Sequence, residues 1–179
     1  MADLTVRFGS QTDYEEVLRF YDRVVEANSG TEYDVLWNRE VHPSDKEIRD
    51  AIEAGTLYLG FLDGMLVASS VVDDTFTEGY DTVSWKYTAE AGKVLCIHLF
   101  ATEPTSQGRG LGRAFLQAII EDTRARGIVA LRLDAFKHNV PACALYEKVG
   151  FECLGEADLI YEDEDLPRDL PIVAFELLL

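Results

Sequence analysis

The chain has 179 residues, of which 47% are hydrophobic and 27% charged, the ordinary composition of a globular protein with a substantial core. Its formal net charge of −17 argues against binding to nucleic acids or anionic membranes, where basic surfaces supply most of the affinity. An acidic surface favours a cationic partner, although it also serves solubility alone. There is no apolar run of the ~20 residues that span a bilayer and no signal-peptide core, so we expect one cytoplasmic domain, residues 1–179.

The first half of the chain predicts a strand followed by two helices. Residues 4–8 alternate as a strand does, and Thr12-x-x-Glu15 has the pattern of a capping box at the start of a helix. Ser44-x-x-Glu47 has the same pattern, and Gly55 is expected to end the second helix. Apolar residues recur at helical spacing in the first helix and predict its buried face. They are Tyr14, Val17, Leu18, Tyr21, Val24 and Val25.

The next segments predict a hairpin and then the remaining strands and helices. Residues 56–72 form two apolar runs around Asp63-Gly64, a strong hairpin signal. Polar residues 73–92 are expected to form a loop with at most a short helical piece. The expected elements after it are a strand over 93–101, a helix over 111–126 ended by Gly127, a strand over 128–134, a helix from Asn139 to Gly150 with Pro141 in its first turn, and strands over 151–154 and 171–179.

The glycine-rich stretch Gln107-Gly-Arg-Gly-Leu-Gly112 lies between an expected strand and an expected helix. Glycines let successive backbone N–H groups turn toward one point, and the helix adds the positive end of its dipole. A pyrophosphate suits such a site. The stretch lacks the Gly-Lys-Ser/Thr of the ATP-binding loop and the spacing of the dinucleotide fingerprint. The alternative is a turn that needs glycine only for steric reasons.

This stretch matches Gln/Arg-x-x-Gly-x-Gly/Ala through Gln107, Gly110 and Gly112, and the segment Asn139 to Phe151 follows it. Together the two segments resemble the GNAT (GCN5-related) N-acetyltransferases, specifically over about residues 94–153. The resemblance implies an α/β (α+β) fold with a mixed, mostly antiparallel, seven-stranded sheet, flanked by about four helices. Its central strands would splay apart around the pantetheine arm. It also implies acetyl-CoA as cosubstrate without a metal, and leaves a homodimer open because many relatives are dimers.

The resemblance assigns cofactor contacts to the glycine turn and to the end of the strand before it. Arg109 or Arg113 could add charge-assisted bonds to the pyrophosphate. Thr102 replaces a valine that is usual in the family, a change that contact through the backbone should tolerate. Asn139 matches an asparagine that binds the pantetheine arm, and its alternative role is a helix N-cap. The expected cofactor-binding residues are Phe100, Ala101, Thr102, Gln107, Gly108, Arg109, Gly110, Leu111, Gly112, Arg113 and Asn139.

Acetyl transfer to a primary amine, by direct attack, needs a base and benefits from an acid. Tyr146 matches the family's tyrosine near the thioester sulfur and is the expected acid, the alternative being a tyrosine that only packs. His98 is the expected base, because some relatives place a basic residue on this strand and an ordinary imidazole pKa of ~6.5 suits the task. Even-numbered residues from Cys96 to Phe100 would share its face. A core histidine is the alternative.

Other features leave several interpretations open. Weaker candidates for the base are Glu103, His42 and Glu40, or a water chain, while His138 is expected at the surface. The acidic run 156–169 could attract an ammonium group or be a solvated loop. The three cysteines Cys96, Cys143 and Cys153 fit no metal or disulfide pattern and are expected to be buried thiols. The acceptor could belong to a small molecule or a peptide. Alternative functions are an acyl-CoA-binding regulatory module without turnover and an enzyme with a longer acyl donor.

Overall fold

The structure is a computed structural model that describes residues 4–88, 90, 92–106, 108–160 and 170–179. Seven strands form one sheet in the order β1-β2-β3-β4-β5-β7-β6, and only β4 and β5 run parallel. The expected fold class is therefore confirmed. The strands are β1 (Thr5–Phe8), β2 (Leu57–Leu62), β3 (Met65–Asp73), β4 (Val94–Thr102), β5 (Ala130–Phe136), β6 (Glu152–Ala157) and β7 (Ile172–Leu178). The α-helices are α1 (Tyr14–Asn28), α2 (Asp45–Ala54), α3 (Leu111–Ala125) and α4 (Val140–Val149).

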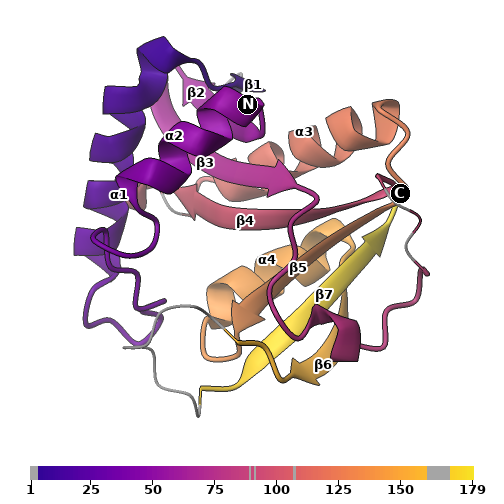
Figure 1. The fold of residues 1–179 in the computed structure, drawn as a ribbon. Coiled ribbons are helices and arrows are strands. Elements are labelled where there is room, and N and C mark those ends of the chain that lie inside the picture. The colour runs from indigo at the N-terminus through magenta and orange to yellow at the C-terminus, as the bar shows by residue number, and fades with distance from the viewer. Residues whose placement is uncertain (1–3, 89, 91, 107, 161–169) are drawn as a thin grey trace.

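The sheet opens in its middle, as the resemblance implied. Val94, Leu95 and Cys96 of β4 pair with residues 130–132 of β5, and the ladder ends there. Figure 1 shows the two strands diverging from this point. Each strand stays paired on its other side, β4 with β3 and β5 with β7. The opening therefore exposes one backbone edge of each central strand.

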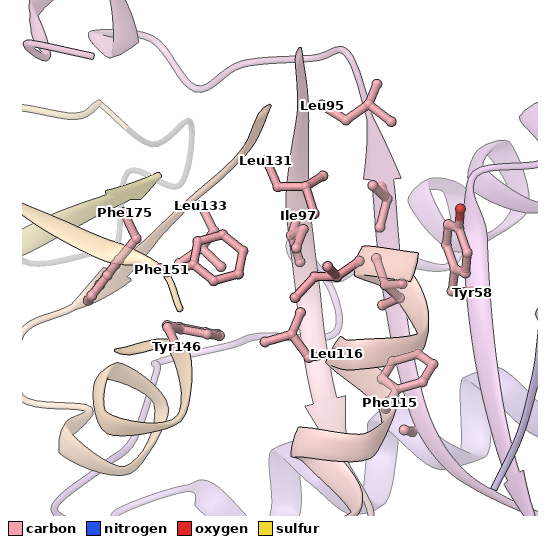
Figure 2. Close-up of a cluster of buried hydrophobic side chains, with 14 of the residues drawn as sticks. Tyr58, Leu95, Ile97, Phe115, Leu116, Leu131, Leu133, Tyr146, Phe151 and Phe175 are labelled. Carbon is pink, nitrogen blue, oxygen red and sulfur yellow. The ribbon is translucent and has the colours of Figure 1, made fainter. Parts of the chain in front are cut away.

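The helices form two layers, one on each side of the sheet. Helices α1 and α2 bury Phe20, Tyr21 and Ile48 in a core with residues of β2 and β3. Helices α3 and α4 contribute to a second core, in which Phe115 and Leu116 lie on the β3–β4 side and Tyr146 lies near Phe151 and Phe175 (Figure 2). This second core fills the space behind the diverging strands. It joins the two halves of the sheet.

Local signals placed most element ends correctly, with one exception. Ser44 accepts a hydrogen bond from the backbone of Glu47, and Gly55 ends α2 at φ 68°, as expected. The capping box predicted at Thr12 is wrong. Asp13 accepts hydrogen bonds from the Ser10 backbone and hydroxyl at 2.8 and 2.6 Å, because a 3₁₀ turn over residues 11–13 precedes α1. Arg7 also binds this carboxylate, at 2.7 Å, and these contacts hold the pKa of Asp13 below its usual range.

The cysteines differ in exposure, contrary to the expectation that all three are buried. Cys96 is buried under Tyr80, whereas Cys143 on α4 is half-buried. Cys153 is exposed and lies on β6, the last strand of the sheet. In the part of the chain that the structure describes, no helix is long and apolar enough to cross a membrane.

Candidate active site

A cleft of about 1140 Å³ lies where β4 and β5 separate. It brings together residues that are distant in the sequence, from the glycine turn, both central strands and α4. Among the predicted site residues, Arg109 is exposed and is not part of the cleft wall, and Gln107 lies outside the described residues. The predicted residues that do line the cleft are His98, Phe100, Ala101, Thr102, Gly108, Gly110, Leu111, Gly112, Arg113, Asn139 and Tyr146.

The glycine turn presents bare backbone to this cleft. Gly108 and Gly110 have φ values of 76° and 77°, in the left-handed region that favours glycine, and a Cβ on either would meet no atom within 4 Å. Gly110 is the N-cap of α3 and supplies no side-chain cap. The first N–H groups of a helix have no intrahelical partner, so those of Leu111 to Arg113 can bind an anion at the positive end of the helix dipole.

Gly112 has a different role, in packing. A Cβ at this position would lie 3.3 Å from Cδ2 of Leu145 and 3.4 Å from Cγ2 of Thr102. These distances are tight, so a side chain here would press α3 away from α4 and from the end of β4. Glycine therefore keeps the helix N-terminus close to the opening between the strands.

A β-bulge shapes β4 at the centre of the cleft. Ser69 pairs with Ala101 and Val71 with His98, so β4 contains one extra residue here, and Leu99 has φ 51°. The hydroxyl of Tyr21 donates to the Leu99 carbonyl at 2.7 Å, and the hydroxyl of Ser70 donates to the His98 carbonyl at 2.9 Å. These hydroxyls supply the hydrogen bonds that the two carbonyls would accept from a neighbouring strand in a regular ladder.

The bulge corrects the expectation that Cys96, His98 and Phe100 share one face. Phe100 packs with Ile97 in the core under α3 and α4, whereas Leu99 packs in the core under α1 and α2. The extra residue shifts the alternation by one position, which strict period-two reasoning cannot foresee.

Two residues of α4 line the cleft with polar atoms. The Oδ1 atom of Asn139 accepts a hydrogen bond from the Ala142 backbone at 3.3 Å, so Asn139 caps the helix, and its amide nitrogen has no hydrogen bond within the described part of the chain. Tyr146 is buried among Phe100, Phe151 and Phe175, with ring centroids 5.6–6.2 Å away. Burial raises the pKa of Tyr146, so its hydroxyl keeps its proton at neutral pH.

The surroundings of His98 raise its pKa, contrary to the expected ordinary value. Its Nε2 atom lies 3.1 Å from the Thr75 carbonyl and 3.6 Å from a carboxylate oxygen of Asp73. Burial alone would lower the pKa of His98, but Cys96 and Asp73 raise it to about 11. A protonated imidazole cannot accept a proton from an amine, so the raised pKa counts against His98 as the base, and that role stays a prediction.

The weaker candidates for the base have different surroundings. Glu103 forms an ion pair with Arg23 at 2.8 Å, and Glu40 is exposed, and neither lines the cleft. His138 is half-buried against Phe136 and lies 2.8 Å from the Asp34 carbonyl. His42 does line the cleft, and its Nδ1 atom lies 2.8 Å from the Glu47 carboxylate.

The sequence interpretation missed Asp134 and the apolar rim of the cleft. Asp134 lines the cleft from β5, and its carboxylate accepts a hydrogen bond from Tyr80 at 2.6 Å. Its position at the end of the strand predicted over 128–134, which follows the strand over 93–101 and the helix after it, was the available signal. Four exposed hydrophobic side chains also line the cleft, and they come from three loops with no periodic pattern. They are Tyr33, Val41, Phe76 and Ile160.

A model of the acetyltransferase (GNAT) family matches residues 19–151 of this chain. The match covers most of the chain, including the glycine turn and α4. This chain belongs to the GNAT family. The resemblance seen in the sequence is therefore confirmed.

Curated members of this family match the chain over a short segment. A ribosomal protein bS18-alanine N-acetyltransferase of Salmonella typhimurium is 45% identical over 51 residues, which are 28% of this chain and 34% of that protein. A mycothiol acetyltransferase of Saccharomonospora viridis is 37% identical over 65 residues, which are 36% of this chain and 21% of that protein. The alignment thus spans a third or less of these GNAT relatives.

Solved GNAT structures share the fold over nearly the whole chain. A GNAT acetyltransferase of Streptococcus agalactiae has a TM-score of 0.80 at 23% identity and covers 98% of this chain and 95% of its own. A Salmonella typhimurium protein solved with its cofactor acetyl-CoA has a TM-score of 0.66 at 16% identity, covering 99% and 94%. At these identities the likeness is one of fold.

Proposed function

We propose that this GNAT protein transfers the acetyl group of acetyl-CoA to a primary amine by direct attack, without a covalent enzyme intermediate. The observation that carries the proposal is the cleft, which joins an uncapped helix N-terminus at Gly110 to the opening between β4 and β5. The chemistry of this cleft fits a pyrophosphate at one end and an amide-containing arm along a free strand edge.

The residues present support the cosubstrate at both points. The N–H groups of Leu111, Gly112 and Arg113 supply donors for phosphate oxygens, and Arg113 adds a cation on the cleft wall. The edge of β4 from Phe100 to Thr102 faces away from β3 and has no ladder with β5, so it can pair with amide groups as a strand would. Bound acetyl-CoA supplies an activated acyl carbon and a thiolate leaving group.

Tyr146 is the residue that we propose as the acid. Its ring is fixed by three aromatic neighbours on the cleft wall, and its raised pKa keeps the proton available for the departing sulfur. Asn139 is proposed to donate its amide N–H to the pantetheine arm while its carbonyl caps α4. The expectation that His98 is the base remains a prediction, against which the ion pair with Asp73 stands.

The acceptor is proposed to be a primary amine of a small molecule or of a peptide N-terminus. One relative is named for acetylating ribosomal protein bS18 alanine and another is named a mycothiol acetyltransferase, so both a peptide and a small-molecule acceptor are consistent with the relatives. The net charge of −17 would favour the approach of a cationic amine. A cytoplasmic location fits these substrates and stays a prediction.

A thiol-release assay tests the function directly. Acetyl-CoA is incubated with spermidine, kanamycin, phenylalaninamide or a peptide that begins with alanine, and mass spectrometry identifies the acetylated product. Release that depends on the amine supports the proposal. Tight CoA binding without release from any amine would instead favour a regulatory module, and faster release from butyryl-CoA than from acetyl-CoA would favour a longer donor.

A further inference from the structure

His42 and Glu47 form a hydrogen-bonded pair on the wall of the cleft. Nδ1 of His42 lies 2.8 Å from Oε1 of Glu47. The other oxygen of Glu47 accepts hydrogen bonds from the Ser44 backbone at 2.6 Å and from the Ser44 hydroxyl at 2.8 Å. The carboxylate is thereby anchored at the N-terminus of α2, and it can orient the imidazole rather than follow it.

The imidazole ring is also held by its aromatic neighbours. Its centroid lies 6.2 Å from that of Trp37, with the rings nearly perpendicular, and Trp37 lies 5.9 Å from Tyr21. Tyr21 is the residue whose hydroxyl binds the bulge in β4 at Leu99. A continuous chain of packed side chains therefore links His42 to the strand that lines the cleft.

We infer that His42 is the general base of the acetyl transfer and that Glu47 is its positioning residue. This inference rests on the proposed function. A carboxylate on Nδ1 favours the tautomer with a proton on Nδ1, which leaves the lone pair of Nε2 free to accept a proton. Nε2 has no hydrogen bond to the described part of the chain. His98 differs in this respect, because its Nε2 already faces Asp73 and the Thr75 carbonyl.

Charged groups near His42 come from its own loop, α1 and α2, and Glu40 on that loop is exposed. Glu47 of α2 contacts His42 directly. Arg39, on the same loop, is bound to Asp22 of α1 at 2.9 Å and to Asp45 of α2 at 2.7 Å. The side chains of His42 and Glu47 are 44% and 42% exposed, so the imidazole can return its proton to water after each turnover.

The reaction balances with these groups. An ammonium acceptor loses two protons when its nitrogen forms the bond to the acyl carbon and the C–S bond breaks. The first goes to Nε2 of His42 and on to solvent. The second restores the hydroxyl of Tyr146, whose own proton has gone to the leaving sulfur. The products are the amide, the free thiol and one proton.

The test compares pH profiles of kcat/KM for the wild type, His42→Gln and Glu47→Gln, with acetyl-CoA and the fastest amine among spermidine, kanamycin, phenylalaninamide and an alanine-initiated peptide. Glu53→Gln is the matched control, because Glu53 is an exposed carboxylate on α2 outside the cleft wall. We expect His42→Gln to lower kcat/KM by roughly 100-fold or more at neutral pH. We also expect it to abolish the acidic limb of the profile, which is the fall of kcat/KM toward acidic pH that protonation of the base would cause. Glu47→Gln should lower kcat/KM less and shift the limb, and Glu53→Gln should change neither.

Chemical rescue and thermal melts separate catalysis from folding. His42→Ala should recover part of its rate when imidazole is added, which a purely structural loss would not allow. Melting curves and CoA calorimetry of each variant show whether it is folded. A folded His42→Gln variant that keeps the acidic limb and the rate overturns the proposed role of His42 but leaves the proposed function in place. No thiol release by the wild type, despite CoA binding, overturns the proposed function and this role with it.

Discussion

Tyr146 and His98 show how one cleft gives two titratable side chains opposite tendencies. Both residues line the opening between β4 and β5. Burial among aromatic rings favours the neutral form of the phenol, whereas a carboxylate beside the imidazole favours its cation. The shifts favour the tyrosine as a proton donor at neutral pH and disfavour the histidine as a proton acceptor.

Replacing Tyr146 with Phe keeps the ring and removes the proton donor. We expect kcat to fall by roughly one to three orders of magnitude, near the usual effect of a general acid. The KM for acetyl-CoA should change little, because the contacts of the ring with Phe100 and Phe175 remain. Steady-state kinetics with saturating amine measures both constants. An unchanged kcat, with chemistry shown to limit turnover, would exclude the acid role.

Replacing His98 with Gln removes the ion pair with Asp73. The pKa of His98 is raised from 6.5 to about 11, so its contribution to stability is full below about pH 6.5 and disappears as pH rises through about 11. We expect the variant to unfold with a free energy lower by about 1–3 kcal/mol at pH 6, and the difference to shrink at alkaline pH. Denaturant unfolding at several pH values measures this. Loss of the acidic limb of the rate profile would instead restore His98 as the base.

The sequence alone predicted which residues line the cleft better than it predicted the surroundings of their side chains. Tyr146 and Asn139 could be placed because their motif is local and specific. The carboxylate beside His98 could not be predicted, because Asp73 lies on another strand and only the β3–β4 pairing brings the two side chains together. The pairing of His42 with Glu47 was equally hidden, although they are only five positions apart.

At the scale of elements, the glycine turn and α3 act as one unit. The turn places bare N–H groups in the cleft because Gly108 and Gly110 adopt left-handed backbone. Local signals of this kind also predicted the cap at Ser44 and the turn at Asp63-Gly64. The bulge in β4 had no such signal, because it depends on hydroxyls supplied by Tyr21 and Ser70 from other elements.

Replacing Gly110 with Val tests the anion site, and Gly64→Val is its matched control. Both glycines have φ values near 78° with open space around a new Cβ, so both variants should lose about 1–2 kcal/mol of stability from backbone strain. Only Gly110→Val puts a side chain beside the amides proposed to bind phosphate. We expect its affinity for CoA to fall by roughly tenfold or more, measured by calorimetry, with Gly64→Val unchanged. Equal affinities in folded variants would refute the assignment of the cofactor to this turn.

Across the whole molecule, two half-sheets meet through the short ladder at Val94, Leu95 and Cys96. Beyond it, the amides of β4 that face β5 have no strand partner among the described residues. We expect CoA to slow hydrogen exchange of residues 97–102 and 108–113, because the bound arm and phosphates would occupy these donors. Exchange measured by mass spectrometry with and without CoA gives the result. Peptides from β6 serve as the internal control, and protection confined to them would contradict the binding mode.

The loops at the apolar rim of the cleft have a consequence for how this protein could change over time. Residues 28–43 and 75–78 line the cleft but contribute no residue to the seven-stranded sheet. Substitutions at exposed positions there, such as Tyr33, Val41 and Phe76, alter the lining without disturbing the ladders, whereas Val35 and Trp37 also pack against the cores. On the proposed function, changes at these exposed positions would alter the range of amines, in evolution or in the laboratory, while the proposed binding site of the acyl donor is inherited intact.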